Sequence, residues 1–531
     1  MNLADLLTKW YANAEAYKTA ELGGGVQDFV LYADTKETIM SEKKNRRALK
    51  VSGKAALFSR MKAPAEKEAE ELPYSYSRRG FLQSVIAALI LPALSGQNVT
   101  KAGEKSSNSD SQYKNYVDIL KQELLPAMGC TEPVALAFAA AKASEILGMP
   151  PEKALVEMSG NIVKNVKSVV VPNTGGRKGI KTSVAAGIVV GKAGKKLELL
   201  ADVSDAQRKS IAELLEKVPM ELKMLDTGRV LEIIVTLYAG NSWSRVRIVD
   251  AHTNVVSEEK DGVFLLQKEN DEPRRPDETE GMALNVEEII GFADRVDIED
   301  VREVIERQIE YNSAIAAEGL KGNYGANIGK LLRKSYGNDI KVKAKAAAAA
   351  GSDARMSGCD LPVIIVSGSG NQGMTASLPV IEYALHLNKS REELIRALVL
   401  SNLLTIHMKA GIGRLSAYCG VVTAGAAAGA GIAYLQGGKF DAVAHTLVNA
   451  LAITSGIVCD GAKPSCAAKI AASVDAGIWG YEMFKNGQEF HSGDGIVSKG
   501  VENTIKNISR LGKEGMRETD KEIIQIMLSE E

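Results

Sequence analysis

Four of the five cysteines lie in short polar segments, where a thiol could act as a metal ligand or a nucleophile. Cys130 lies in Gly-Cys-Thr-Glu-Pro, Cys419 ends Gly-Arg-Leu-Ser-Ala-Tyr-Cys, and Cys459 and Cys466 bound Cys-Asp-Gly-Ala-Lys-Pro-Ser-Cys. A cysteine used for packing is expected among Leu, Ile and Val. The spacing of the cysteines fits neither zinc ribbons nor ferredoxins, so the interpretation of these cysteines as ligands or nucleophiles rests on their polar neighbours. Cys359 leads into an apolar strand and is interpreted as a core residue.

Cys130 precedes a predicted helix at residues 133–147. The positive end of a helix lowers the pKa of a nearby thiol and favours the thiolate. The sequence therefore predicts a thiolate at Cys130, suited to metal binding or nucleophilic attack.

Two glycine-rich segments, residues 171–181 and 367–373, resemble anion-binding loops. Glycine lets backbone N–H groups approach an anion, and Asn, Ser and Arg hydrogen-bond a carboxylate or phosphate. Neither segment matches a phosphate loop or a dinucleotide fingerprint. His407 lies two residues before Lys409 in another polar motif, which makes it a candidate base or carboxylate ligand.

The composition excludes several classes of protein. The 531 residues are 45% apolar and 25% charged, as in an average globular protein rather than a fibrous, disordered or membrane protein. The net charge of −1 offers no overall field for nucleic acid or an anionic membrane. Five cysteines are too few, and odd in number, for a disulfide scaffold.

Residues 1–113 differ from the rest of the chain and are interpreted as a poorly ordered extension, with a linker at 97–113. Residues 77–96 contain Ser-Arg-Arg-Gly-Phe-Leu, an apolar run and small residues, the layout of a twin-arginine export signal. The run of about ten apolar residues is too short to span a bilayer. A signal this far from Met1 is unusual, and a short buried helix is the alternative.

The remainder predicts an α+β fold with a predominantly helical catalytic domain at 114–195 and 267–525 and a small α+β domain inserted at 196–266. The insert is expected to contain strands at 197–203, 221–225, 230–239 and 243–250 and a helix at 205–218. Residues 420–438 are uncharged and rich in Gly and Ala, which predicts close packing of a helix in a soluble core.

Five motifs in order resemble the L-cysteine desulfidase and L-serine dehydratase alpha-chain-like family, which includes UPF0597-type proteins: Gly-Cys-Thr-Glu-Pro, Pro-Asn-Thr-Gly-Gly, Ser-Gly-Ser-Gly-Asn-Gln-Gly, Gly-Arg-Leu-Ser-Ala-x-Cys-Gly and Cys-Asp-Gly-Ala-Lys-Pro-Ser-Cys. The similarity covers roughly residues 114–520. It implies an oxygen-labile [4Fe–4S] cluster, held by three cysteines with one iron open, and β-elimination from a small amino acid.

The resemblance also implies the site residues. The resemblance to desulfidases implies that Cys130, Cys419 and Cys459 are cluster ligands, and the resemblance to serine dehydratases adds Cys466. The sequence leaves open which three of the four are structural. The candidates for catalysis and proton transfer are Cys130, Glu132, His407, Lys409 and Lys463. The candidates for binding the substrate are Thr131, Asn173, Thr174, Arg177, Lys181, Ser367, Gly368, Ser369, Gly370, Asn371, Gln372 and Arg414.

The expected reaction converts L-cysteine and water to pyruvate, ammonia and hydrogen sulfide, with L-serine as the alternative substrate. A pyridoxal-phosphate lyase and a non-catalytic amino-acid sensor are competing interpretations. The expected partner is a small amino acid, with no nucleic acid and no stable membrane span, and a homo-oligomer stays open. The family resemblance favours the cytoplasm, whereas residues 77–96 favour export.

Overall fold

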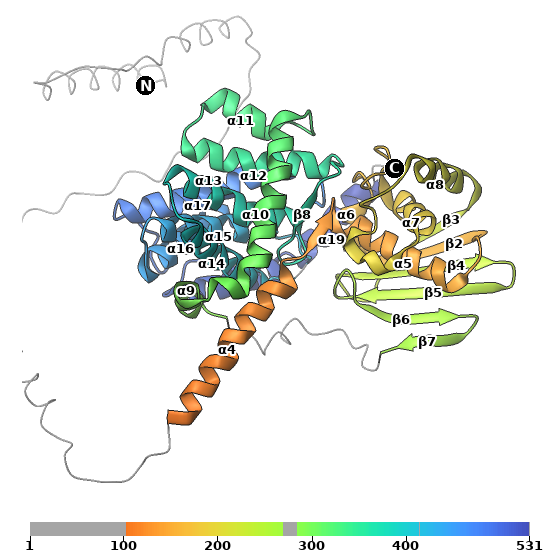
Figure 1. Ribbon diagram of the computed structural model, residues 1–531, viewed down its shortest axis with the longest axis horizontal. Helices are drawn as coiled ribbons and strands as arrows, with labels where there is room; N and C mark the ends of the chain where they lie inside the picture. The colour runs from red at the N-terminus through yellow and green to blue at the C-terminus, as the bar shows by residue number, and fades with distance from the viewer. Residues whose placement is uncertain (1–101, 269–283, 414, 530–531) are drawn as a thin grey trace, which may run out of the picture. The chain divides into compact units, whose positions relative to one another are not determined.

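The computed structural model of the chain describes residues 102–268, 284–413 and 415–529, which all belong to one compact unit. The predicted export signal and residues 1–101 of the predicted extension lie outside the described residues, as does Arg414. The described part is an α+β fold in which helices predominate, as the sequence predicts (Figure 1).

The linker predicted at residues 97–113 is wrong from Ala102 onward, where helix α4 (Ala102–Glu123) begins. Tyr113 and Tyr116 place their ring centres 5.4 and 4.9 Å from that of Phe292. Tertiary packing therefore stabilises a helix whose polar composition gives little sign of it.

The helical part is built around α15, which corresponds to the uncharged run at 420–438. This helix packs against α13, α14, α16 and α17. A Cβ on Gly477 would lie 2.1 Å from the carbonyl oxygen of Gly425, so α15 and α17 approach as closely as their backbones allow. No helix in the described ranges is both long and apolar enough to cross a bilayer. The helices are α9 (Val286–Arg295), α10 (Ile298–Lys321), α11 (Ile328–Tyr336), α12 (Ile340–Met356), α13 (Gly370–His386), α14 (Arg391–Ala410), α15 (Gly420–Leu435), α16 (Phe440–Thr454), α17 (Cys466–Lys485), α18 (Val501–Arg510), a short π-helix (Leu511–Gly515) and α19 (Arg517–Ser529).

The α+β part contains a six-stranded sheet in the order β3-β2-β4-β5-β6-β7, in which β2 and β3 are parallel and the other neighbours antiparallel. Helix α5 packs on β4 and β5, and α7 packs against α5 and α8 (Figure 1). The strands are β2 (Lys153–Ser159), β3 (Met220–Leu225), β4 (Glu232–Ala239), β5 (Ser242–Val249), β6 (Val255–Lys260) and β7 (Val263–Gln267); the helices are α5 (Thr131–Leu147), α6 (Gly160–Val166), α7 (Gly179–Val190) and α8 (Asp205–Lys217).

Two findings differ from the prediction for this part. Strand β2 precedes residue 196, so the sheet extends beyond the predicted insert. The strand predicted at 197–203 is wrong, because a 3-10 helix (Ala193–Glu198) and turns occupy this region. Its leucines are buried, and a short buried apolar run does not distinguish a strand from other structure. The helix α8 and the strands β3, β4 and β5 confirm the rest of the prediction.

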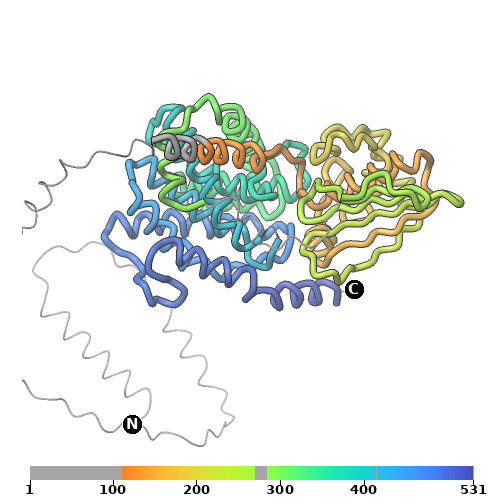
Figure 2. The backbone as a smooth tube through the Cα atoms, turned by 90° about the horizontal axis from the view of Figure 1, so that it is seen from below, coloured from red at the N-terminus to blue at the C-terminus, as the bar shows by residue number. Residues whose placement is uncertain are grey.

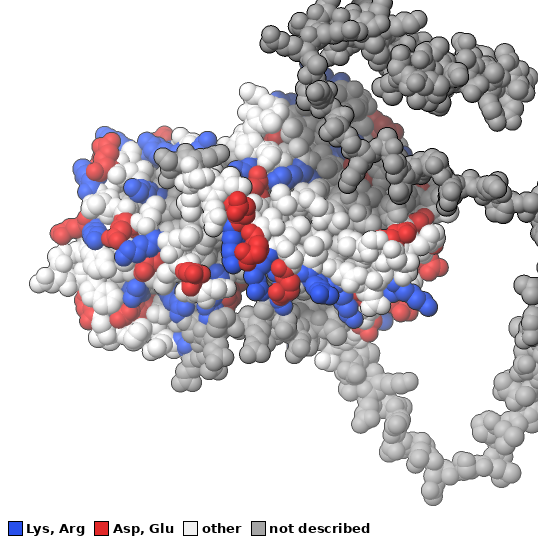
Figure 3. Space-filling model, turned by 180° about the vertical axis from the view of Figure 1, so that it is seen from behind, with Lys and Arg blue, Asp and Glu red and all other residues white. Residues whose placement is uncertain are grey.

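The two parts are also joined by a short antiparallel pair, β1 (Pro126–Met128) and β8 (Pro362–Ile364). Each strand leads directly into a predicted site motif, β1 into Gly-Cys-Thr-Glu-Pro and β8 into the Ser-Gly-Ser-Gly-Asn loop. This pairing therefore brings the two motifs together. Acidic and basic side chains are intermixed on the face seen in Figure 3, in keeping with the near-zero net charge.

Candidate active site

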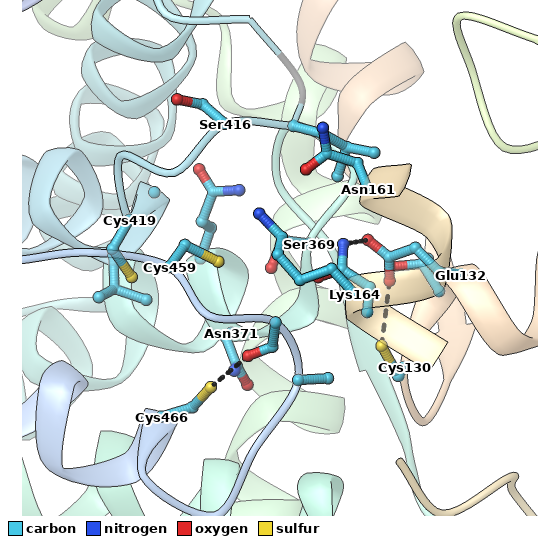
Figure 4. A pocket seen from close by; sticks show the side chains of 18 of the residues that line it. Cys130, Glu132, Asn161, Lys164, Ser369, Asn371, Ser416, Cys419, Cys459 and Cys466 are labelled. Carbon is cyan, nitrogen blue, oxygen red and sulfur yellow. Dashed lines mark hydrogen bonds between the residues drawn. The ribbon is translucent and has the colours of Figure 1, made fainter. Parts of the chain in front are cut away.

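The four cysteines in polar motifs line one cavity of about 90 Å³, although they come from segments up to 336 residues apart. Figure 4 shows Cys419, Cys459 and Cys466 on one side and Cys130 with Glu132 on the other. The other polar side chains of the wall are Thr131, Asn161, Lys164, Asn165, Arg355, Ser369, Asn371, Gln372, Lys409, Ser416 and Tyr418.

Local backbone structure positions the group of three cysteines. Cys419 is the N-cap of α15 and Cys466 is the first residue of α17. The backbone around Cys419 pairs with the backbone around Cys459: the Cys419 N–H donates to the Ile457 carbonyl at 3.2 Å, and the Cys459 N–H donates to the Ala417 carbonyl at 2.6 Å. This short bridge holds Cys419 and Cys459 side by side, and α17 adds Cys466 beside them.

The three thiols differ in how readily they ionise. The Cys419 thiol donates a hydrogen bond to Cys459, and this bond lowers the pKa of Cys459. Burial acts in the opposite direction, whereas the positive charge of Lys164 lowers the pKa further. The same bond and burial raise the pKa of Cys419, and burial raises that of Cys466. Of the three thiols, Cys459 is therefore the one whose surroundings favour the thiolate.

Cys130 does not carry the thiolate that its helix position predicts. It is the N-cap of α5, but burial and the adjacent negative charge of Glu132 raise its pKa well above the ordinary value. Its Sγ donates to Glu132 Oε2 at 3.0 Å. Desolvation and a like charge thus outweigh the helix dipole, and Cys130 is a protonated thiol.

Glu132 is the charged member of this pair. Burial alone would raise its pKa, but nearby His252 and the Cys130 thiol lower the pKa to about 2. Its Oε1 accepts from Asn165 Nδ2 at 3.1 Å and lies 3.7 Å from His252 Nε2. Glu132 therefore remains an anion, fixed from two sides.

The Ser-Gly-Ser-Gly-Asn loop reaches the cavity with only some of its residues. Ser369, Asn371 and Gln372 line the wall. Asn371 Oδ1 accepts from Arg355 at 3.1 Å, so this loop also orients a buried guanidinium. Of the remaining predicted residues, Ser367 and Gly368 turn the backbone with positive φ angles and Gly370 begins α13; the Gly368 carbonyl accepts from Thr131 Oγ1 at 2.8 Å.

The Pro-Asn-Thr-Gly-Gly segment does not line the cavity. Asn173 donates to the carbonyls of residues 200 and 201, Thr174 to Val171, and Arg177 to Thr174. Lys181 lies on α7 and is exposed. The polar side chains that resemble an anion cradle in sequence thus stabilise their own loop and its neighbour.

Two further candidates, Lys463 and His407, do not line the cavity. Lys463 Nζ donates to Ser168 Oγ at 2.8 Å, and burial lowers the pKa of Lys463 against the opposing charges of Asp460 and the cysteines. His407 Nε2 lies 2.9 Å from Glu502 Oε2. Lys409 does line the wall, and its ammonium donates to the Gly413 carbonyl.

We expect His407→Gln to retain catalysis within about three-fold and to lower the free energy of unfolding by about 1–2 kcal/mol. The reason is that His407 contacts Glu502, which also accepts from the Val286 N–H, and so joins α14 to α18 and α9. Steady-state kinetics and chemical unfolding of the same preparation check this. A variant of unchanged stability that has lost its activity would restore His407 as a catalytic candidate.

Sequence reasoning missed several residues of the cavity wall. Asn161, Lys164 and Asn165 lie at positions i, i+3 and i+4 of α6, so they share one face of that helix. This spacing in an otherwise apolar segment was a usable signal. The missed residues that line the cavity are Asn161, Lys164, Asn165, Arg355, Ser416 and Tyr418, with His252 behind Glu132.

The donors around the cavity suit a cluster better than a single ion. No group of three or more His, Cys, Asp or Glu side chains within the described ranges is arranged to hold one metal ion. An iron–sulfur cluster makes a different demand, because thiolates bind its separate irons and need only surround it. Three neighbouring thiols, one of them easily ionised, and nearby lysines fit such an anionic group.

Comparison with known proteins places the chain in a family. A family model described as serine dehydratase alpha chain matches residues 194–525. A UPF0597 protein of Desulfitobacterium hafniense is 59% identical over 79% of this chain and 98% of its own length. Relatives named UPF0597 protein in Lachnoclostridium phytofermentans and Treponema denticola are 52% and 46% identical, over 78% and 79% of this chain and 100% and 99% of their own. The chain therefore belongs to the serine dehydratase alpha-chain-like UPF0597 family.

Proposed function

We propose that the protein is a lyase that eliminates sulfide from L-cysteine, giving pyruvate, ammonia and hydrogen sulfide with consumption of one water. The observation that carries the proposal is the convergence of four cysteines, two lysines and an arginine on one buried cavity. Thiols suit a soft metal cluster, and cations suit the carboxylate of a small substrate. L-Serine, which would lose water in the same reaction, is the second candidate because the matching family model is that of serine dehydratases.

We propose that Cys419, Cys459 and Cys466 would hold a [4Fe–4S] cluster; Cys130 lies on the other side of the same cavity (Figure 4). When bound, such a cluster supplies a Lewis acid that polarises the substrate. The ionised Cys459 is prepared for metal binding, because a thiolate is the form that binds metal. Lys164 and Lys469 balance the negative charge of this group.

The chain's own residues bind the amino acid and move its proton. The cations Lys164, Arg355 and Lys409 are available to attract the carboxylate into the buried cavity. Elimination removes the Cα proton, forms the Cα–Cβ double bond and breaks the Cβ–S bond, and sulfide leaves with a proton. The Cys130–Glu132 pair lines the cavity and is our candidate for moving this proton, with the proton of the pair on Sγ in the resting state.

Anaerobic purification, followed by iron and sulfide analysis and pyruvate assays with L-cysteine and L-serine, tests the proposal. We expect a brown protein that releases pyruvate and whose colour is bleached by air. A substrate-shifted aldimine band without iron would indicate a pyridoxal-phosphate lyase instead. Amino-acid binding without pyruvate would indicate a sensor.

A further inference from the structure

The last helix of the chain lies against the wall of the cavity. Helix α19 packs on α6 (Figure 1), and it is the blue helix that ends at the C-terminus in Figure 2. A Cβ on Gly160 would lie 2.8 Å from Ile524 Cδ1, and Lys167 Nζ donates to the Met527 carbonyl. None of the residues of α19 is fully buried, so the helix contributes little to the core and much of its contact is with α6.

Asp520 of α19 contacts two residues of the cavity wall at once. Its Oδ1 accepts from Lys164 Nζ at 2.5 Å, and its Oδ2 accepts from Asn161 Nδ2 at 2.6 Å. Both partners belong to α6 and line the cavity. One carboxylate, about 360 residues away in sequence, therefore determines how two wall residues are held.

The contact with Asp520 fixes which way the Asn161 amide faces. An ionised carboxylate only accepts hydrogen bonds, so the amide nitrogen must point to Asp520 and the amide oxygen must point elsewhere. Asn161 Oδ1 is buried and makes no hydrogen bond to any described residue. Figure 4 shows the Asn161 side chain at the cavity, across from Cys419, Cys459 and Cys466.

An orphaned acceptor in a buried wall costs free energy unless a ligand or a water molecule pairs with it. The chemical group that fits it is a donor, and an ammonium is the strongest of the donors that a small amino acid carries. Lys164, which is 1% exposed and lies three residues further along the same face of α6, supplies the matching cation for a carboxylate.

We propose that Asp520 is a positioning residue that makes this wall of the cavity specific for α-amino acids. It fixes Asn161 so that Oδ1 accepts from the substrate's α-ammonium, and it holds Lys164 in place for the α-carboxylate. The proposal rests on the proposed function for the identity of the cavity as the substrate site. It assigns to the C-terminal helix a role in substrate recognition.

Asp520→Asn in the full-length protein tests the proposal, because an amide no longer forces Asn161 to present its oxygen. We expect the KM for L-cysteine to rise by roughly 10- to 100-fold, the loss of a hydrogen bond to a charged group. The inhibition constant of 3-mercaptopropionate, which keeps the carboxylate but lacks the ammonium, should rise by a clearly smaller factor than KM, because only the hold on Lys164 is weakened. Iron content and the visible spectrum should be those of the wild type.

Two matched variants separate recognition from stability. Asp520→Glu keeps an acceptor-only carboxylate and should recover most of the affinity for L-cysteine. Glu518→Gln removes a charge from the same helix, where Glu518 pairs only with exposed Lys521 in the described contacts, and should leave KM unchanged. An unchanged KM in Asp520→Asn, or an equal loss for both ligands, would overturn the proposal.

Calorimetry with L-serine distinguishes this proposal from the proposed function. A wild-type protein that binds L-serine but releases pyruvate from neither L-serine nor L-cysteine, and an Asp520→Asn variant that binds L-serine more weakly, would support the recognition role while overturning the lyase. Pyruvate release by both proteins with equal KM would support the lyase and overturn the recognition role. A wild-type protein that binds no amino acid would overturn both.

Discussion

Cys459→Ser is expected to abolish both iron binding and pyruvate formation in protein reconstituted under anoxia. Cys459 is the thiol that ionises first, because Cys419 donates to it and Lys164 lies nearby. A serine oxygen is a harder and weaker ligand for iron–sulfur clusters than a thiolate. Changes to groups that merely support a metal ligand already cost roughly 10- to 100-fold in affinity or activity, so loss of the ligand should cost at least about 100-fold.

Cys359→Ser is the matched control for this experiment. Cys359 is buried beside the Tyr324 hydroxyl and does not line the cavity. The same replacement there should leave iron content and turnover close to those of the wild type. Wild-type iron content in Cys459→Ser, with Cys419→Ser behaving likewise, would contradict the assignment of the cluster to this group.

The cysteine wall of the cavity could be predicted because its residues have conspicuous local settings. Cys130 and Cys419 are helix N-caps, and Cys466 begins a helix. Such positions interrupt hydrophobic periodicity with Gly, Pro and polar residues, which a sequence displays openly. The helical core around α15 was predictable for a similar reason, since an uncharged run of small residues allows a helix to pack closely against its neighbours.

The opposite wall could not be predicted because its determinants are contacts between distant residues. Nothing local to Asp520 marks it as the partner of Lys164, and nothing local to His252 places it behind Glu132. The Asn173 loop shows the converse, since its polar side chains are satisfied by nearby carbonyls and do not reach a ligand. Residue type states what a side chain can bind, whereas the fold decides what it does bind.

The Cys130 thiolate was predicted from the helix dipole alone, and the prediction is wrong because other effects on the pKa of this thiol are larger than the dipole. The dipole contributes typically 0.3–1 kcal/mol, roughly 2 at most. Burial and a carboxylate 3.0 Å away act in the opposite direction, and each can exceed the dipole. The two-residue spacing of Cys130 and Glu132 was visible in the sequence, but the direction of the Glu132 side chain was not.

We expect Glu132→Gln to lower kcat by about 10²- to 10⁴-fold, because this is the usual contribution of a positioned proton-transfer group. KM should change little, because both Glu132 oxygens are engaged by Cys130 and Asn165 rather than held free for substrate. Single-turnover kinetics with L-cysteine, compared with Glu258→Gln in a sheet ion pair remote from the cavity wall, give the measurement and its control.

The same variant makes the pKa argument testable without turnover. Burial and Glu132 both raise the pKa of Cys130, so removing the carboxylate should lower that pKa while burial keeps it above the ordinary value. Thiolate then forms at lower pH, and alkylation of Cys130 at a fixed, mildly alkaline pH should be faster in Glu132→Gln than in the wild type. Faster alkylation with a wild-type kcat would mean that Glu132 controls ionisation of the thiol but that the catalytic proton moves through Lys409 or Lys463. Slower alkylation would mean that Glu132 favours the thiolate, and would contradict the assignment of the resting proton to Sγ.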